Sequence, residues 1–442
     1  MSNYRHTILL SLLALGLLLI TVAPANATTQ WSRKYGVSCN TCHTIFPRLN
    51  SYGEMFLKNG YQDPDAAQPD GATKGKTSLN DDAQIDKVDN FLGLRLNLTP
   101  FKMTTKDMRV ELGSDRKDEY ETRFTFGNTD WFQVFYAGSI NKNLSIFIEA
   151  ESAQTGFKFN WFYMGFHHIV GDLVNFQIGN ISPVEFASYP DRLPQLPAAP
   201  KSKAFSIKTS GGGAPEDAVD MRSARHGLQW YGWQGPVTVW AGFAPGGNPT
   251  GVNANNTLGY WVGGRYDIPE TMGALAGSNA TLWFMGGTDA SNTGGNAPGD
   301  SLQHTNGFTR ISPQFNLRME NVDIQFAYAL GSEDNYALVH PDSVKTDFSF
   351  NGITLVAGYL MGKWFPTVQF DQFSAKIADK DAPAMKSTML TPAITYLWKE
   401  NVRYSIYADL DMRSEVKAGD ATADKPTYTP KNSVYVNIRV MI

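Results

Sequence analysis

Two cysteines and a histidine within five residues are the part of this sequence best suited to chemistry. Cys39 and Cys42 are the two cysteines of the chain, and His43 directly follows the second. This Cys-x-x-Cys-His spacing is the attachment pattern of a c-type haem. The thiols add across the vinyl groups of one haem, and the adjacent histidine binds the iron as proximal axial ligand. We therefore predict one covalent haem c at Cys39, Cys42 and His43.

Three other uses of the Cys-x-x-Cys spacing fit the sequence less well. A redox-active pair is expected within a thioredoxin-like βαβ pattern, which is missing from this sequence. A zinc site needs two further ligands, and none lies close in sequence. A structural disulfide would not require His43.

The second axial ligand of such a haem is left open by the sequence. Met55 lies near the motif, although methionine at such a position is as often a core residue. His168 is the other candidate. It falls on the lumen-facing side of a strand whose opposite face carries Phe157, Phe159, Trp161 and Tyr163, so that His167 would point to lipid or to the rim. A methionine ligand raises the haem potential, and a second histidine generally lowers it.

The residues after the motif predict a short helix that packs against the haem. Leu49, Tyr52 and Phe56 recur at helical spacing, with Asn50 as N-cap and Gly60 as the glycine that ends the helix. The haem segment 28–62 is too small to form a cytochrome with its own core. We expect it to be buried against the haem and against the rest of the chain.

The N-terminus predicts export. Arg5 precedes an apolar stretch over 8–22, and Ala25-Asn26-Ala27 supplies a small-residue cleavage site. We predict a cleaved secretory signal peptide over 1–27, because the apolar run is short for a retained transmembrane helix.

From Asp89 onward the sequence alternates apolar and polar residues with a period of two. The clearest runs are 92–98, 144–150, 322–328, 402–410 and 434–442. This period over segments of about ten residues is the signature of transmembrane β-strands, of which we expect about 16. The prediction is an all-β fold: a transmembrane outer-membrane β-barrel over 89–442, a linker over 63–88, and the helical haem segment acting as a plug.

The composition agrees with a barrel. The chain has 442 residues, of which 42% are hydrophobic and 18% charged, with a net charge of -4. A single long apolar run argues against a helical membrane protein, two cysteines against a disulfide scaffold, and the lack of basic excess against nucleic-acid binding. A soluble β-sandwich is the alternative, but Arg95, Glu149 and Asp409 would then face a packed core.

The connections between the expected strands fall into two kinds. Those at 141–143 and 399–401 are short, whereas 182–225, 289–301 and 415–431 are long and rich in Gly, Asn, Asp and Pro. Short turns at one rim and long loops at the other are typical of bacterial outer-membrane barrels. Eight tryptophans within or near the strands predict aromatic girdles at the membrane interfaces. They are Trp131, Trp161, Trp230, Trp240, Trp261, Trp283, Trp364 and Trp398.

The stretch 34–50, KYGVSCNTCHTIFPRLN, followed by Tyr52-Gly53-Glu54 and Asn59-Gly60-Tyr61, resembles the outer-membrane monohaem cytochrome–porin fusions of iron-oxidising bacteria. The resemblance covers the whole chain in architecture, but it is specific in sequence over only about 30 residues. It implies a protein of the Gram-negative outer membrane, surrounded by lipid. In such a protein, Fe(II) at the cell surface would give an electron to the haem, and a periplasmic cytochrome or other carrier would receive it. The activity would be that of an Fe(II):cytochrome c oxidoreductase.

The resemblance has one departure and leaves two other functions open. Family members tied to iron oxidation carry a Phe-Ala-Arg-Gln-Thr-Gly run before the haem, whereas 31–36 reads WSRKYG, which keeps only the arginine and the glycine. The electron donor therefore stays open. The alternatives to a conduit are a diffusion porin with a haem-bearing plug and an outer-membrane haem enzyme such as a peroxidase.

Overall fold

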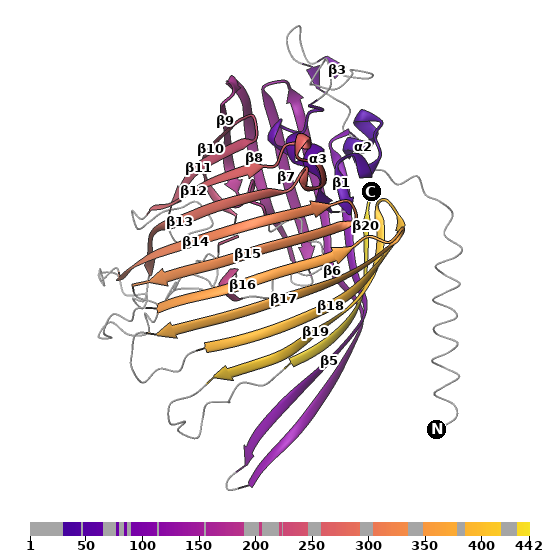
Figure 1. Ribbon diagram of the computed structural model, residues 1–442, viewed down its shortest axis with the longest axis vertical. Helices are drawn as coiled ribbons and strands as arrows, with labels where there is room; N and C mark the ends of the chain where they lie inside the picture. The colour runs from indigo at the N-terminus through magenta and orange to yellow at the C-terminus, as the bar shows by residue number, and fades with distance from the viewer. Residues whose placement is uncertain are drawn as a thin grey trace.

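A computed structural model describes most of the chain. The described residues are 30–45, 47–64, 77–78, 84–85, 90–112, 115–153, 156–189, 203–205, 221–222, 224–245, 258–291, 304–334, 348–377, 385–416 and 431–442. The predicted signal peptide and most of the predicted linker lie outside them. The described chain forms a large β-barrel with a small N-terminal unit at one end (Figure 1).

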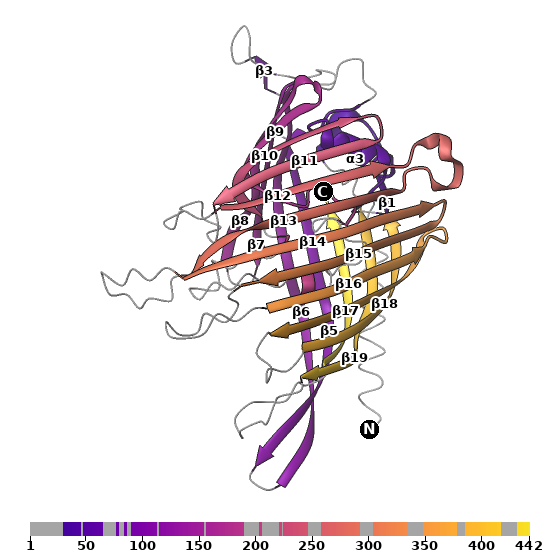
Figure 2. The same cartoon turned by 60° about the vertical axis from the view of Figure 1, so that its left-hand side comes forward.

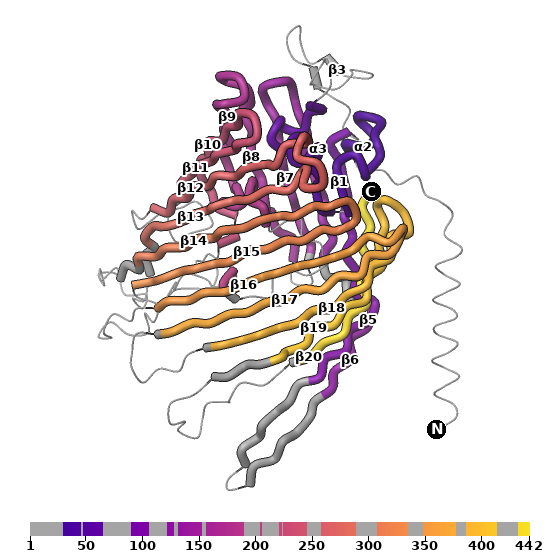
Figure 3. Tube along the Cα trace, viewed as in Figure 1, coloured from indigo at the N-terminus to yellow at the C-terminus, as the bar shows by residue number. Residues whose placement is uncertain are grey.

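Sixteen antiparallel strands of the described chain close the barrel, which confirms the predicted number. Each strand pairs with its neighbours in sequence, and β20 pairs with β5 to complete the ring, so the first and last strands lie side by side (Figure 3). The strands are β5 (Leu92–Leu112), β6 (Asp115–Asn141), β7 (Leu144–Ala153), β8 (Gly156–Asp172), β9 (Val174–Ile181), β10 (Arg225–Gln234), β11 (Val237–Pro245), β12 (Leu258–Asp267), β13 (Asn279–Ser291), β14 (His304–Met319), β15 (Val322–Glu333), β16 (Phe348–Tyr359), β17 (Trp364–Ile377), β18 (Met385–Lys399), β19 (Val402–Val416) and β20 (Lys431–Met441).

The strands turn apolar side chains outward and polar ones inward. Leu282 and Ile406 are 61% and 54% exposed on the outer face. Arg95, Glu149 and Asp409 are buried on the inner face. A wide apolar exterior needs lipid around it, and a lumen can hold charges that a packed core cannot. The protein is therefore a transmembrane β-barrel, as the alternation predicts.

The two rims of the barrel differ, also as predicted. Tight turns at 142–143, 235–236, 320–321 and 400–401 join the strands at one rim. The C-terminal residue lies at this rim, where Ile442 and Leu94 exchange two backbone hydrogen bonds of 2.8 Å. Figure 2 shows the N-terminal unit at the same end. In bacterial barrels this rim faces the periplasm.

The N-terminal unit is built from short elements. They are α2 (Gln30–Tyr35), the 3₁₀ turn η1 (Cys39–Thr41), β1 (His43–Ile45), β2 (Arg48–Leu49) and α3 (Ser51–Lys58). Asn50 caps α3 by accepting a hydrogen bond of 2.9 Å from the Gly53 amide, and Gly60 follows the helix with φ of 68°. Both ends of the predicted helix are thus confirmed. None of the described helices is long and apolar enough to cross a membrane.

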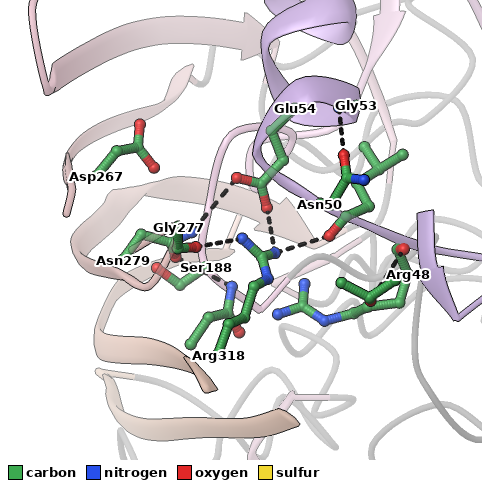
Figure 4. A network of polar contacts seen from close by, with 12 residues as sticks. Arg48, Asn50, Gly53, Glu54, Ser188, Asp267, Gly277, Asn279 and Arg318 are labelled. Carbon is green, nitrogen blue, oxygen red and sulfur yellow. Dashed lines mark hydrogen bonds and ion pairs between the residues drawn. The ribbon is translucent and has the colours of Figure 1, made fainter. Parts of the chain in front are cut away.

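Buried ion pairs hold this unit, which we call the plug (30–64), against the barrel wall. The Glu54 carboxylate of α3 forms ion pairs with Arg265 and Arg318, the latter at 2.7 Å (Figure 4). Arg48 pairs with Asp323 at 3.4 Å. The Glu54 carboxylate could not be buried against an apolar wall, because it would lose its hydration without gaining a cationic partner.

Additional polar contacts spread around the plug. Lys58 donates to Thr238 at 3.1 Å, and Tyr231 donates to the Lys58 carbonyl at 2.9 Å. On the other side of the plug, Glu400 in the β18–β19 turn accepts hydrogen bonds from Ser38 and from the Cys39 amide. The plug is therefore anchored on widely separated strands.

A second segment fills part of the lumen. Residues 182–189, which follow β9, fold inward, and the Pro183 carbonyl accepts hydrogen bonds from the indoles of Trp240 and Trp283 at 3.0 and 2.9 Å. Trp161, Trp240, Trp261 and Trp283 are all buried inside the barrel, so the girdle prediction is wrong for these four. Cross-strand glycines give two of them room, since a Cβ at Gly263 would meet the Trp240 ring at 2.1 Å.

Replacing Glu54 by Gln tests the docking of the plug. Glu54→Gln leaves Arg265 and Arg318 buried without this counter-charge, and loss of one partner of a buried pair costs roughly 3–5 kcal/mol. We expect faster proteolysis of the plug from an intact barrel. Glu270→Gln, an exposed change at the same rim, is the control and should cleave at the wild-type rate. Equal rates for both variants would contradict the role of Glu54.

Glu54 also gives the docking a pH dependence of defined sign. Burial would raise the pKa of Glu54, but Arg265 and Arg318 outweigh burial and lower the pKa from 4.5 to about 2. A carboxyl with a lower folded pKa contributes its full stability above the unfolded value and loses it as the pH falls through the folded one. Protease resistance of the wild-type plug should exceed that of Glu54→Gln above pH 4.5, and the difference should shrink between 4.5 and about 2. A difference independent of pH would contradict this.

Candidate functional site

The Cys-x-x-Cys-His motif borders two cavities, a larger one between the plug and the inner wall of the barrel and a smaller one lined by plug residues. The larger has a volume of about 860 Å³, which includes space open to solvent. The smaller is about 460 Å³ and reaches Cys39. Cys42 and His43 line both cavities. The larger cavity is lined by Gln30, Trp31, Cys42, His43, Pro47, Leu49, Gly53, Phe56, Leu57, Tyr61, Arg95, Phe135, Phe147, Glu149 and Met441.

The His43 ring is held in one orientation. Its Nδ1 lies 3.0 Å from the Pro47 carbonyl oxygen, a contact that fits the N–H tautomer at Nδ1. A metal-binding histidine commonly donates its other ring N–H to a backbone carbonyl, and this makes Nε2 the nitrogen that would bind iron. Burial lowers the pKa of His43 to about 4, so the ring is neutral at pH 7, as a ligand must be.

The two thiols are close to the cavities and are not joined in a disulfide. Burial raises the pKa of Cys39, and it raises the pKa of Cys42 to about 11. A redox-active dithiol needs a lowered thiol pKa, so these surroundings do not favour that alternative. Among the described residues, no group of three or more His, Cys, Asp and Glu side chains is arranged to hold a metal ion by itself.

The wall of the larger cavity suits a flat apolar ring system. Trp31 and Tyr61 stack with ring centroids 4.9 Å apart, and Tyr61 stacks in turn on Phe147. Two buried polar atoms of this wall, Gln30 Oε1 and the Trp31 indole nitrogen, find no hydrogen-bond partner within the described residues. A buried indole N–H normally has an acceptor, and a haem propionate is one that would fit. The residues present therefore fit a haem.

The structure does not bring either predicted distal ligand to the cavities. Met55 lies on α3 and packs, partly buried, against the apolar cluster that plug and barrel share, whereas Gly53, Phe56 and Leu57 of the same helix line the larger cavity. His168 lies at the rim, where its Nε2 is 2.8 Å from Asn59 Oδ1 and its Nδ1 is 3.2 Å from Asp172.

The predicted faces of β8 are wrong beyond Phe159. Phe157 and Phe159 are exposed on the outside, but Trp161, Tyr163 and His167 are buried inside. The pairing of β8 with β7 shifts after Ala150↔Phe159, and such a bulge inverts the two-residue alternation. His167 consequently contacts Ser145 and Tyr231 in the lumen at 2.6 and 2.8 Å.

Among the lining residues of the larger cavity that were not predicted from the sequence as site residues, three come from the barrel and carry polar or sulfur atoms. Arg95 and Glu149 form an ion pair at 3.8 Å on the lumen wall, and Met441 lies on the last strand. Alternation along 92–98, 144–150 and 434–442 places all three inside. It does not show that they meet the plug, because that depends on β20 closing against β5.

A plug that carries the Cys-x-x-Cys-His sequence, at the short-turn rim of a sixteen-stranded antiparallel barrel, defines a plugged transmembrane β-barrel. The outer-membrane channel DcaP of Acinetobacter baumannii shares this fold, with a TM-score of 0.52, 10% identity, and coverage of 79% of this chain and 97% of that one. OmpT of Vibrio cholerae aligns with a TM-score of 0.49, 11% identity, and coverage of 83% and 100%. The anion-selective porin of Comamonas acidovorans aligns with 0.49, 11%, and coverage of 79% and 99%. No protein-family model matches the sequence, and no curated protein does.

Replacing Gly53 by alanine tests the contact between α3 and the Cys-x-x-Cys-His motif. A Cβ at Gly53 would lie 2.1 Å from the Cys42 carbonyl oxygen, which is backbone and cannot move easily. Alanine normally favours a helix by about 1 kcal/mol over glycine, whereas overpacking costs about 1–3 kcal/mol. Gly53→Ala should therefore lower the unfolding temperature of the plug. Ser51→Ala, an exposed change on the same helix, is the control. A stabilised Gly53→Ala variant would show that α3 does not pack on Cys42.

Proposed function

We propose that this chain is an outer-membrane electron conduit of a Gram-negative bacterium, exported by a cleaved signal peptide, with one covalent haem c in its plug. The observation that supports this is that Cys39, Cys42 and His43 line apolar cavities of a plug that docks on the inner wall of a transmembrane barrel. Haem c supplies a one-electron redox centre when bound. The fold of DcaP agrees with a barrel protein of this kind but does not bear on the haem.

The residues of the chain would have separate roles in this function. Cys39 and Cys42 would hold the haem through thioether bonds, and the Pro47 carbonyl would orient the His43 ring to bind its iron. Trp31, Phe56 and Phe147 exclude water from the site. The ion pairs of Glu54 keep the plug seated at the rim.

The position of the plug determines from which side each redox partner would reach the site. Because the short-turn rim faces the periplasm, the site lies close to soluble periplasmic carriers, and an extracellular donor approaches it through the lumen. With Fe(II) as the donor, each Fe(II) becomes Fe(III), and one ferric periplasmic cytochrome becomes ferrous.

The two alternatives differ from the conduit in what they require. A diffusion porin needs a wide open lumen, but the plug and residues 182–189 each fill part of this one. A peroxidase needs an open axial position and a polar group beside it, and Arg95 with Glu149 could provide the group. Sugar-driven swelling of vesicles would favour the porin. Rapid cyanide binding by the ferric protein would favour the enzyme.

Replacing the cysteines tests whether the protein is a c-type cytochrome. The wild-type protein should keep its haem on a denaturing gel, and the double variant Cys39→Ser/Cys42→Ser should lose it. Asn40→Ala changes the exposed residue between the thiols and should keep the haem. Failure of the wild type to stain for haem would refute the function.

The electron donor is tested with the same purified wild-type protein. We expect Fe(II) to reduce it and a ferric periplasmic cytochrome to re-oxidise it. In oriented vesicles, Fe(II) should act from the long-loop side. Reduction by Fe(II) from the short-turn side alone would contradict the orientation. Reduction by another extracellular donor but not by Fe(II) would refute Fe(II) as the donor and leave the proposed conduit standing.

A further inference from the structure

The larger cavity offers few atoms that could bind iron opposite His43. Among its described lining residues, the side chains with a nitrogen, oxygen or sulfur ligand atom beyond the motif are Gln30, Tyr61, Glu149 and Met441, if the cationic Arg95 and the non-basic indole of Trp31 are set aside. Met55 and His168 are not among them. The choice therefore lies between three oxygen donors and one thioether.

The oxygen donors are less suited to the iron. The Tyr61 hydroxyl is hydrogen bonded to the Tyr163 hydroxyl, and the Glu149 carboxylate accepts from Gln133 and pairs with Arg95. An amide oxygen such as that of Gln30 is not among the usual axial ligands of haem, whereas methionine is the ligand that accompanies histidine in cytochromes c.

Met441 carries a neutral thioether on a main chain that hydrogen bonds hold in place. Its side chain is buried, with 8% exposed. Its amide donates to the Asn401 carbonyl at 3.0 Å, and Asn401 Nδ2 donates to the Met441 carbonyl at 2.7 Å. The next residue, Ile442, is paired with Leu94 of β5. The main chain at the end of β20 is thus held on both sides, so binding a metal through Met441 would cost little main-chain freedom.

We propose that Met441, from the last strand of the barrel, is the distal axial ligand of the haem whose proximal ligand is His43 in the plug. The inference rests on the proposed function, since it requires the covalent haem. It goes further, because the barrel itself completes the coordination of the iron. The plug and the barrel wall would then be joined through the metal as well as through the ion pairs of Glu54.

This ligand pair has consequences for the redox chemistry. A methionine ligand raises the haem potential above that of a bis-histidine site. A high potential allows the site to accept electrons from a weak reductant such as Fe(II). It also makes the site six-coordinate, which leaves no open position for a peroxidase.

The test uses the purified full-length holoprotein and its absorption spectrum. Ferric wild type should show a sulfur-to-iron charge-transfer band, and Met441→Leu should lose it, bind cyanide faster and have a lower midpoint potential. Met55→Leu is the matched control, because it removes a methionine of the plug that does not line the cavity, and it should keep the band. Met441→His should restore a low-spin six-coordinate spectrum with a potential below that of wild type.

Each contrary outcome has a separate meaning. A band that survives in Met441→Leu, or one that is lost in Met55→Leu, overturns the assignment while the covalent haem and the proposed function stand. A wild-type protein that holds covalent haem but lacks the band overturns it too. A wild type without covalent haem refutes the function and the ligand together. Heat-modifiable migration of each variant on gels shows whether its barrel is folded.

Discussion

Every strand of the barrel faces two different surroundings, and this constraint shapes the rest of the structure. Lipid outside requires apolar side chains, so each inward-facing position is available for polar ones. The lumen is consequently lined with charged groups such as Arg265, Arg318 and Asp323. A plug that enters this lumen must bring complementary charges, and Glu54 and Arg48 supply them. Ion pairs therefore fix the plug on this polar wall, and the apolar contacts of Phe56 and Tyr61 with the barrel add to them.

The larger cavity is an exception to the polar lining of the lumen. Phe135, Phe147 and Met441 occupy inward positions on β6, β7 and β20, next to the plug. They meet Trp31 and Phe56 of the plug, so each body contributes part of the apolar wall. An even number of strands places the start of β5 and the end of β20 at the same rim. The topology alone thus brings the N-terminal plug and the C-terminal Met441 together.

Patterns confined to neighbouring residues could be predicted from the sequence. The period of two gave the sixteen strands and the inward charges, and the cap at Asn50 followed from local preference. Pairings between distant positions could not, since Glu54 and Arg265 are 211 residues apart. The faces of β8 were missed because a bulge is not visible in the alternation. The inward tryptophans could have been recognised, because Trp240 shares its parity with Thr238 and Gly242 on β11.

The division of the site between two bodies gives a physical reason for a covalent haem. A cytochrome with a core of its own can retain its haem by burial, but a plug this short buries little by itself. Its cavity becomes complete only where β5, β6, β7 and β20 approach it. Under the proposed function, thioether bonds to Cys39 and Cys42 would hold the haem whether or not those strands surround it. The attachment motif would then secure the cofactor, and the barrel would supply the apolar surroundings and the distal sulfur that set its potential.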